Sequence, residues 1–356
     1  MTTPRLIAFY LPQYHPIPEN DTWWGQGFTE WLSVVKARPL FPGHDQPHLP
    51  ADLGFYDLRL PDTRQAQAEL AREYGIHGFC YFHYWFQGRR LLEQPFNAVL
   101  ESGQPDFPFC LCWANHHWSR AWDGQRQHVL LEQTYSEHDD REHIRWLARA
   151  FSDPRYIRVE GKPLFLIYEA SQLPDPLRTT TLWRDEARQL GVGELFLCKV
   201  DNFQDRRLPP QHSGFDAAVE FQPDTAMLLS MFERAWWRLS RGLKILRGAL
   251  ICSYANWVRR VIRQPLPSYR RFPCVTPGWD NSPRRRSGAF ILHGTTPTLY
   301  EQWLAATLRR QPLGPSERIV FINAWNEWAE GNHLEPCQRW GRAYLEATRR
   351  AVQHAR

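Results

Sequence analysis

The stretch RIVFINAWNEWAEGNHLEP, residues 318–336, begins with an apolar run and continues into a loop rich in tryptophan and glutamate. The apolar run, 318–325, lacks the period of two that marks a strand with one solvent-exposed face. Such a run is typical of a strand buried on both faces of a parallel sheet. Asn326, Glu327 and Glu330 follow it, and α/β barrels build their sites at this end of their strands. The stretch therefore predicts a parallel α/β fold with a polar site after its last strand.

Seven similar apolar runs precede this one, and helical patterns lie between them. The predicted strands are at 5–12, 76–83, 108–114, 163–169, 195–201, 215–221 and 273–278. The predicted helices are at 62–74, about 138–151, 178–190, 298–310 and 341–354. Such alternation in 356 residues predicts an α/β fold, a single (β/α)8 or TIM barrel formed by residues 1–356, with a doubly wound open sheet as the alternative.

Residues 224–265 interrupt this alternation before the seventh strand. Within them, 226–263 combine an apolar stripe, which includes Leu228, Met231 and Phe232, with arginines on the other side. A basic amphipathic helix of this kind binds membrane surfaces that contain anionic lipids. A lid over the barrel mouth is the alternative and the commoner use of such insertions. We therefore expect the insertion to be a lid or a peripheral membrane-surface element.

Charge and cysteine content narrow the class of protein. The 43 basic and 38 acidic residues give a formal net charge of +5, which gives no reason to expect a nucleic-acid partner. The seven cysteines lie mostly in apolar runs, and apart from the close pair Cys110 and Cys112 they show no metal-ligand spacing. We expect reduced core thiols, no metal and no cofactor.

The N-terminal residues pass directly into the first predicted strand and leave no room for a secretory signal. No run reaches the roughly 18 apolar residues that a membrane span needs. We therefore expect a cytoplasmic protein, either soluble or associated with the inner face of the membrane through 226–263.

Aromatic residues are abundant, with 17 Trp, 13 Tyr and 20 Phe. Aromatic rings stack on the C–H faces of sugars, but they also fill ordinary cores. Their positions in the sequence must therefore distinguish a sugar site from a core. Many follow the predicted strands together with polar residues, which favours a sugar site over simple loop boundaries. The predicted substrate-binding residues are Tyr14, His15, Glu30, His83, Tyr84, Trp85, Asn115, Trp118, Tyr168, Asp280, Trp325, Asn326 and Glu335.

Glu327 and Glu330 are the candidate catalytic residues. Their spacing of three places both side chains on one face of a helical turn, with Cβ atoms ~5–6 Å apart. Cleavage of a glycosidic bond commonly needs one carboxylic acid and a second carboxylate that acts as base or nucleophile. Acidic residues that only complement a helix dipole have the same spacing.

For other polar residues near the strand ends, the sequence gives weaker evidence of ligand binding. His83, His116 and His117 could ligate a metal in principle, but adjacent histidines at a strand end point apart and form no spaced motif. Asp280 could orient a hydroxyl group. The three arginines 284–286 could pair with a phosphate or an acidic sugar, or form a solvated basic loop.

Six blocks in this sequence closely resemble the WbsX-like family, which is related to glycoside hydrolase family 99. The blocks are YLPQYHPIPEND at 10–21, WWGQGFTEW at 23–31, GFCYFHYWF at 78–86, CWANHHWSRAWDG at 112–124, PGWDNSPRR at 277–285 and NAWNEWAEGNHLEP at 323–336. The resemblance implies a (β/α)8 fold and action on glycans, since family 99 enzymes cleave mannosides with retention through an anhydro-sugar. It also implies that Glu327 assists the substrate's 2-hydroxyl and that Glu330 is the acid/base. Family 99 enzymes have histidine at the position of Ala329, so the resemblance does not extend to mannose specificity.

Residues and resemblance together predict an enzyme that acts on glycosidic bonds of a bacterial cell-surface polysaccharide, using Glu327 and Glu330. The expected substrate is a polysaccharide or a lipid-linked glycan. One alternative is a glycosyltransferase of O-antigen, capsule or lipopolysaccharide biosynthesis, which the lack of a visible signal peptide favours. A second alternative is a barrel that binds glycans without catalysis.

Overall fold

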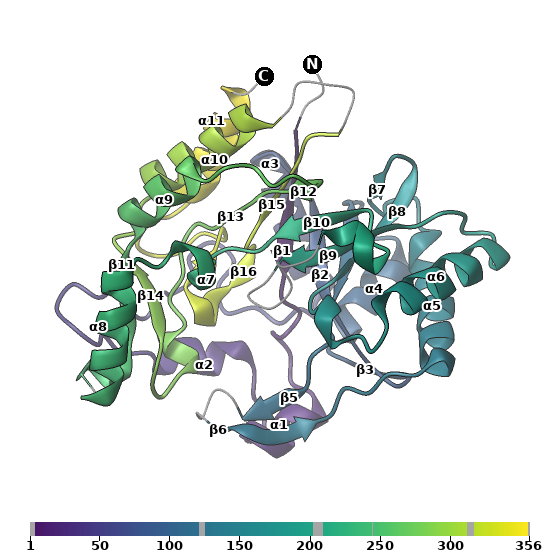
Figure 1. Cartoon of the computed structure of the whole chain (residues 1–356). Coiled ribbons are helices and arrows are strands. Elements are labelled where there is room, and N and C mark those ends of the chain that lie inside the picture. The colour runs from purple at the N-terminus through teal and green to yellow at the C-terminus, as the bar shows by residue number, and fades with distance from the viewer. Residues whose placement is uncertain (1–3, 121–124, 202–208, 244, 312–316, 355–356) are drawn as a thin grey trace.

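The computed structural model describes residues 4–120, 125–201, 209–243, 245–311 and 317–354. The end of the block at 112–124 and residue 244 of the insertion lie outside the described residues. A parallel sheet forms the centre of the molecule, with strand order β12-β10-β9-β8-β4-β2-β1-β15-β13 (Figure 1). These strands are β1 (Arg5–Tyr10), β2 (Ile76–Phe86), β4 (Phe109–Trp113), β8 (Lys162–Ile167), β9 (Phe196–Asp201), β10 (Ala217–Glu220), β12 (Arg271–Phe272), β13 (Cys274–Val275) and β15 (Ile319–Ile322).

The seventh position of the sheet is divided between two short strands. β12 pairs with β10, and β13 pairs with β15, each through two residue pairs. Pro273 separates them, and proline has no N–H group to donate to a ladder. Its carbonyl still accepts a hydrogen bond from the Phe321 N–H at 2.8 Å. The two half-strands nearly close the sheet into a barrel, which confirms the predicted (β/α)8 fold, although the seventh strand ends earlier than the predicted 273–278.

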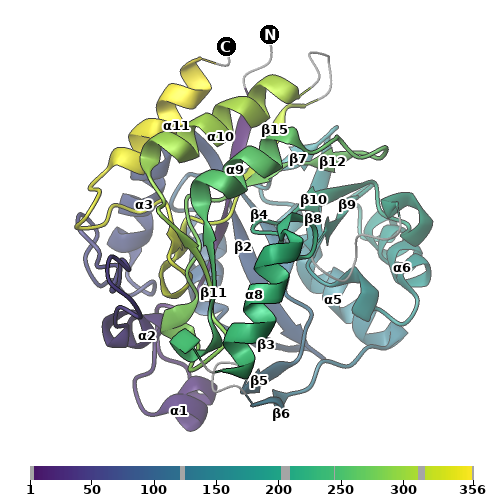
Figure 2. The ribbon, with the colours of Figure 1, turned by 60° about the vertical axis from the view of Figure 1, so that its left-hand side comes forward.

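Helices cover the outside of the barrel (Figure 1, Figure 2). They are α3 (Pro61–Glu73), α4 (Gln94–Ser102), α5 (Glu137–Phe151), α6 (Pro176–Gln189), α10 (Pro297–Arg310) and α11 (Ala343–Gln353). Side-chain caps begin several of them: the Ser136 hydroxyl accepts from the Asp139 N–H, and Thr296 caps α10 in the same way. In the described part of the chain, only the short turn η3 (Pro210–Ser213) lies between β9 and β10.

Aromatic rings fill much of the interior. The Phe9 ring lies 5.5 Å from the rings of both Phe82 and Phe221 and 5.4 Å from the ring of Phe321. These four side chains come from strands or strand ends on different sides of the barrel, so they form a layer across its inside. Many aromatics thus build the core, and only part of the aromatic content is available to a sugar site.

The insertion before the seventh strand is a small α/β unit. It contains α7 (Thr225–Leu228), α8 (Met231–Gly242), η4 (Ile245–Gly248), β11 (Leu250–Ser253) and α9 (Tyr254–Arg263), and β11 pairs in parallel with β14 (Phe290–His293). Helix α9 is anchored by buried side chains that include Trp257, whereas Ser240 is the buried residue of α8. Figure 2 shows α8 lying on the outside of the molecule. Across the described residues, no helix is long and apolar enough to cross a membrane.

Candidate active site

The two glutamates lie on a tight hairpin directly after β15. The hairpin consists of β16 (Asn326–Glu327), the 3-10 turn η6 (Trp328–Glu330) and β17 (Asn332–His333). Gly331 ends the turn with φ 56, in the left-handed region that glycine adopts without strain. A Cβ atom at Gly331 would lie 3.1 Å from the Cβ of Asp280, so a larger residue here would also press on the neighbouring loop. The predicted helical turn that joins Glu327 and Glu330 is therefore present, as a single 3-10 turn.

Arg284 lies between three carboxylates and joins them. It belongs to the turn η5 (Ser282–Arg284), which follows β13, and its side chain is 9% exposed. Its Nε donates to Oε2 of Glu30 at 3.1 Å, its Nη2 donates to Oε2 of Glu327 at 2.7 Å, and its Nη1 lies 2.8 Å from Oε1 of Glu330. Glu30 begins helix α2 (Glu30–Lys36), after the first strand. Residues that follow β1, β13 and β15 thus form one buried ionic cluster.

Burial controls the protonation of this cluster. Desolvation raises the pKa of Glu327 to about 8; Arg284 opposes the shift, and the negative charges of Glu330 and Glu30 add to it. Desolvation also raises the pKa of Glu30 against the same arginine. One guanidinium cannot neutralise three buried carboxylates, and charge in a low-dielectric site is costly. Burial therefore favours the protonated form of Glu327.

A pocket of about 280 Å³ opens beside the two glutamates, at the carboxyl ends of the barrel strands. Its volume is near the lower end of ordinary ligand sites. Glu327, Glu330 and Arg284 form its charged part. Its aromatic walls are Trp24, Phe82, Tyr84, Trp118, Tyr168, Phe221 and Trp279. Aromatic faces beside paired carboxylates suit a sugar ring, since stacking positions the ring for attack at its glycosidic bond.

Five of the predicted site residues line this pocket: Tyr84, Trp118, Tyr168, Glu327 and Glu330. They come from the ends of β2, β4, β8 and β15, so the barrel brings together residues that are far apart in sequence. Glu30 lies behind them and contacts the pair through the arginine.

The structure does not bring His83 and Trp85 to the pocket. Side chains alternate along a strand, and because Tyr84 faces the pocket, its two neighbours face helix α5. His83 Nε2 lies 2.9 Å from Nε2 of His143, and Trp85 Nε1 donates to Oδ1 of Asp139 at 2.9 Å. Both predicted substrate contacts instead hold α5 against the barrel.

Glu335 is buried and stabilises the hairpin formed by β16, η6 and β17. Its Oε1 accepts from the Gln67 side chain at 2.6 Å, and its Oε2 accepts from the Tyr56 hydroxyl at 2.7 Å and from Trp328 Nε1 at 2.6 Å. Burial raises its pKa to about 7, which these hydrogen bonds oppose. The residue fixes the turn that holds the pair and does not line the pocket.

Asn326, Tyr14 and Trp325 have the same supporting role. The Asn326 side chain accepts from the Leu11 N–H at 2.7 Å and donates to the Leu11 carbonyl at 3.0 Å, which joins the hairpin to the end of the first strand. The Tyr14 hydroxyl donates to the Asn326 carbonyl. Trp325 is fully buried, and its ring lies 5.1 Å from that of Phe79. These three predicted substrate contacts therefore hold the site from below.

Asp280, Asn115 and His15 also lie outside the pocket lining. Asp280 Oδ2 accepts from Gln46 at 2.6 Å and lies 2.7 Å from His44 Nε2, while its Oδ1 accepts from the Ser282 N–H, so it fixes the turn that holds Arg284. Asn115 bonds the backbone of Glu169 through both side-chain atoms. His15 is fully buried, and desolvation lowers its pKa to about 4.

Sequence reasoning missed several pocket residues, above all Arg284 as the partner of the glutamates. The sequence allows either phosphate or acidic-sugar binding or a solvated basic loop for residues 284–286, but the donors of Arg284 face protein carboxylates. Asn20, from helix α1 (Pro18–Trp24), was also missed: it lines the pocket and is fully buried, and neither of its side-chain polar atoms has a hydrogen bond to the residues that the structure describes. The blocks at 10–21 and 277–285 contained both residues, but a motif does not indicate which side chains face inward.

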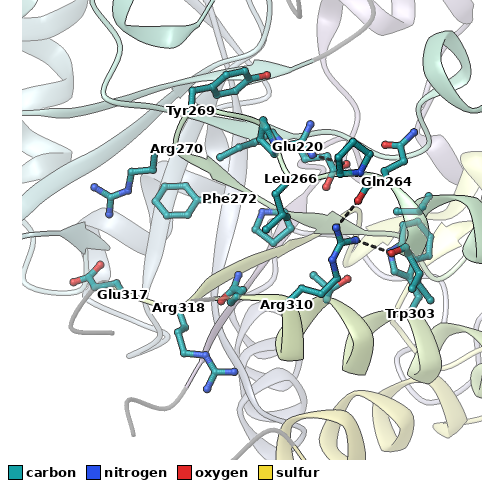
Figure 3. Close-up of a pocket in the computed structure, with 18 of the residues that line it drawn as sticks. Glu220, Gln264, Leu266, Tyr269, Arg270, Phe272, Trp303, Arg310, Glu317 and Arg318 are labelled. Carbon is teal, nitrogen blue, oxygen red and sulfur yellow. Dashed lines mark hydrogen bonds and ion pairs between the residues drawn. The ribbon is translucent and has the colours of Figure 1, made fainter. Parts of the chain in front are cut away.

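A second, larger pocket of about 510 Å³ lies outside the barrel, between β12, α10 and the segment 264–270 (Figure 3). Its carboxylates already have partners: Arg270 donates to Glu160 at 2.6 Å, and Arg271 lies 3.5 Å from Glu220. Arg310 donates to the carbonyl of Ile262 at 2.8 Å and to that of Gln264. Because this pocket lies outside the barrel, and the described residues that line it include no two carboxylates on one turn, the smaller pocket is the candidate active site.

Metal ligands are not gathered anywhere in the described part of the chain, where no three His, Cys, Asp or Glu side chains form a group that could hold an ion. All seven cysteines are buried and unbridged.

The chain matches one family model and two curated relatives over almost its whole length. The family model described as Glycosyltransferase WbsX matches residues 6–348. The "Uncharacterized protein WxcX" of Xanthomonas campestris pv. campestris, in each of two strains, is 47% identical over 352 residues, or 98% of this chain and 50% of that protein. The chain thus spans about half the length of the curated relatives it matches.

Solved structures with the same fold include glycoside hydrolases. A "Glycoside hydrolase-like protein" superimposes with a TM-score of 0.61 at 16% identity and covers 99% of this chain and 94% of that chain. The GH99 endo-alpha-mannosidase of Bacteroides thetaiotaomicron, in complex with BIS-TRIS-Propane, gives 0.60 at 14% identity and covers 99% and 97%. At these identities the likeness establishes the TIM-barrel fold alone.

Proposed function

The chain belongs to the Glycosyltransferase WbsX family, and we propose that it is an enzyme that acts on glycosidic bonds of a bacterial cell-surface polysaccharide. In this proposal Glu327 and Glu330 are the catalytic pair, and the aromatic pocket beside them holds a sugar residue. The observation that supports it most strongly is the position of both carboxylates on one turn, facing a pocket of about 280 Å³ at the barrel's strand ends.

The roles within the pair follow from proton transfer. A retaining mechanism needs one group that protonates the leaving oxygen and a second that attacks or assists attack. The resemblance assigns assistance of the 2-hydroxyl to Glu327, yet burial raises the pKa of Glu327 to about 8 and so favours its protonated form. Assistance by Glu327 therefore requires that it lose this proton when substrate binds. If Glu327 instead donates its proton to the leaving oxygen and Glu330 acts as the carboxylate, Glu327 need not be ionised beforehand.

The test is Glu330→Gln, with turnover of bacterial surface polysaccharides followed by mass spectrometry. We expect the substitution to abolish turnover while glycan binding remains, because glutamine keeps the shape of the side chain but neither attacks nor accepts a proton. Glu101→Gln is the matched control, since Glu101 is exposed and does not line the pocket. Unchanged turnover in Glu330→Gln would refute the assignment.

Transfer and simple binding are distinguished by the same experiment. With nucleotide sugars added, chains that grow indicate the glycosyltransferase of O-antigen, capsule or lipopolysaccharide biosynthesis, and chains that shorten without them indicate the hydrolase. A protein that binds the glycan and changes it in neither condition would be the non-catalytic barrel. Retention of both glutamates in a closely packed site favours an enzyme.

The proposal extends to a lipid-linked glycan substrate at the inner, cytoplasmic face of the membrane, held there through the insertion 226–263. Helix α8 exposes Met231 by 88% and Phe232 by 78%, an unusual exposure for such large apolar side chains. Arg238 and Arg241 lie on the same helix, and arginine beside exposed apolar residues suits a surface of anionic lipids. The lid is the alternative role of this segment.

Flotation with phosphatidylglycerol vesicles at low salt tests the membrane surface. We expect the protein to float with these vesicles, and Phe232→Ser to reduce the bound fraction several-fold because it removes exposed apolar area. Leu266→Ser is the matched control, since Leu266 is 62% exposed but lies at the pocket outside the barrel. Absence of flotation of the unmodified protein would exclude this part of the proposal.

A further inference from the structure

Each of the three side-chain nitrogen atoms of Arg284 already contacts a carboxylate of the protein. Its Nε, Nη1 and Nη2 each face a different carboxylate, at 3.1, 2.8 and 2.7 Å. An arginine that recognises a carboxylate or phosphate presents two parallel N–H groups to it. In this site all three nitrogen atoms already contact protein oxygen atoms, and 9% of the side chain is exposed.

The remaining groups give the pocket a negative charge. Glu30, Glu327 and Glu330 outnumber the arginine, so the cluster has a charge of −2 when all three are ionised and of −1 when one of them holds a proton. Among the described residues that line the pocket, Arg284 is the one Lys or Arg side chain. His116 also lines it, and burial lowers its pKa to about 4, which leaves its ring neutral at pH 7.

Uncharged groups complete the lining. The Asn20 amide is fully buried and lines the pocket, and within the described part of the chain neither of its polar atoms has a hydrogen bond. An amide offers both a donor and an acceptor, which suits a hydroxyl or acetamido group. Aromatic rings such as Trp118 and Tyr168 form the walls and stack on a sugar ring whatever its hydroxyl pattern.

We infer that the sugar subsite beside Glu327 and Glu330 accepts uncharged residues and excludes acidic ones such as uronic acids, and that Arg284 determines this selectivity by remaining bound to the three carboxylates. The inference rests on the proposed function and adds the charge class of the substrate. A uronic carboxylate about 5 Å from a single uncompensated negative charge, at an effective dielectric near 20, would bind more than about a hundredfold more weakly than a neutral analogue. Solvent at the pocket mouth reduces this difference, and we expect at least about tenfold.

Matched sugars that differ only in charge test the inference. Binding of methyl glycosides and the corresponding methyl uronides in the gluco, galacto and manno series is measured by saturation-transfer NMR and calorimetry, with the full chain at pH 7.5. We expect at least one neutral glycoside to bind and its uronide to bind at least about tenfold more weakly. The difference should decrease at high salt, because charge repulsion is screened.

Two variants distinguish selectivity that depends on the charge of the Arg284 cluster from selectivity that depends on the shape of the pocket. Glu330→Gln removes one negative charge inside the pocket, and Glu30→Gln removes one behind it. In both, we expect the discrimination to fall below about threefold, whereas Glu101→Gln retains it. Thermal denaturation of each variant verifies that it is folded, and either folded variant is sufficient for the test.

The outcomes are distinct for the two proposals. A uronide that binds the unmodified protein as tightly as its neutral analogue would overturn the selectivity and leave the proposed function intact. Discrimination that stays unchanged in the folded variants would overturn the role of Arg284. Failure of every glycoside and uronide to bind would overturn the proposed function and this inference with it.

Discussion

Replacement of Glu327 by glutamine tests how strongly the buried cluster resists ionisation. In the folded protein the pKa of Glu327 is raised from an ordinary value of 4.5 to about 8, chiefly by desolvation. A carboxyl with a raised folded-state pKa contributes stability that is fully present below pH 4.5 and is lost as the pH rises through about 8. Glutamine cannot ionise, so the variant should lack this loss.

The size of the effect follows from the shift. Each pH unit between the two pKa values corresponds to about 1.4 kcal/mol, so the whole interval corresponds to roughly 5 kcal/mol of unfolding free energy. Glu327 is 6% exposed, and solvent screening reduces this value little. For 356 residues, 1 kcal/mol shifts the melting temperature by roughly 1.3 °C, so the expected change is roughly 6 °C.

The assay compares melting temperatures of the unmodified protein and Glu327→Gln at pH 5, 7 and 9. Glu335, whose pKa burial raises to about 7, titrates in both proteins and cancels in the difference. Glu101→Gln, at an exposed position, should follow the unmodified protein at every pH. If Glu327→Gln loses as much stability between pH 5 and 9 as the unmodified protein, Glu327 is ionised throughout and the reasoning fails.

Two further substitutions test residues that the structure places outside the pocket. Asp280→Asn should destabilise the protein by about 1.5–3 kcal/mol at pH 7 in chemical denaturation, because hydrogen bonds to a charged acceptor are lost; this penalty should shrink as the pH falls below about 4, since Gln46 and His44 lower the pKa of Asp280 and its stabilisation is lost on protonation. Trp85→Phe removes the donor to Asp139 and should cost about 1–3 kcal/mol. Glycan turnover should stay unchanged in Trp85→Phe, and a loss of turnover in the folded variant would mean that the residue reaches the substrate.

The fold was predictable because its signal is repeated along the chain. Each doubly buried strand has the same unbroken apolar pattern, and the run 318–325 resembles the run 163–169 in this respect. The seventh strand deviates because Pro273 cannot donate to a ladder, which shortens it to two half-strands. The internal structure of the insertion was not predictable, since one amphipathic pattern does not indicate that β11 pairs with β14 across nearly forty intervening positions.

The site was predictable at the level of strand ends, but less so at the level of single side chains. The polar cluster at the end of β2 suggested that His83, Tyr84 and Trp85 all contact substrate, yet alternation allows only every second side chain to face the pocket. The register of the strand decides which of these side chains face the pocket, and tertiary packing sets that register. Arg284 was ambiguous for another reason: its three partners come from residues 30, 327 and 330, and no local pattern shows that they meet at one guanidinium.

The division of the seventh strand at Pro273 has a consequence for how the barrel fluctuates. Two residue pairs hold each half-strand, whereas five join β2 to β4. Transient opening should therefore begin at this seam, and its backbone amides should exchange with solvent before those of the opposite wall. The strand that leads to the glutamates, β15, borders the seam on one side but keeps four pairs with β1 on the other. The barrel can thus open beside its candidate active site while the strand that positions Glu327 remains anchored.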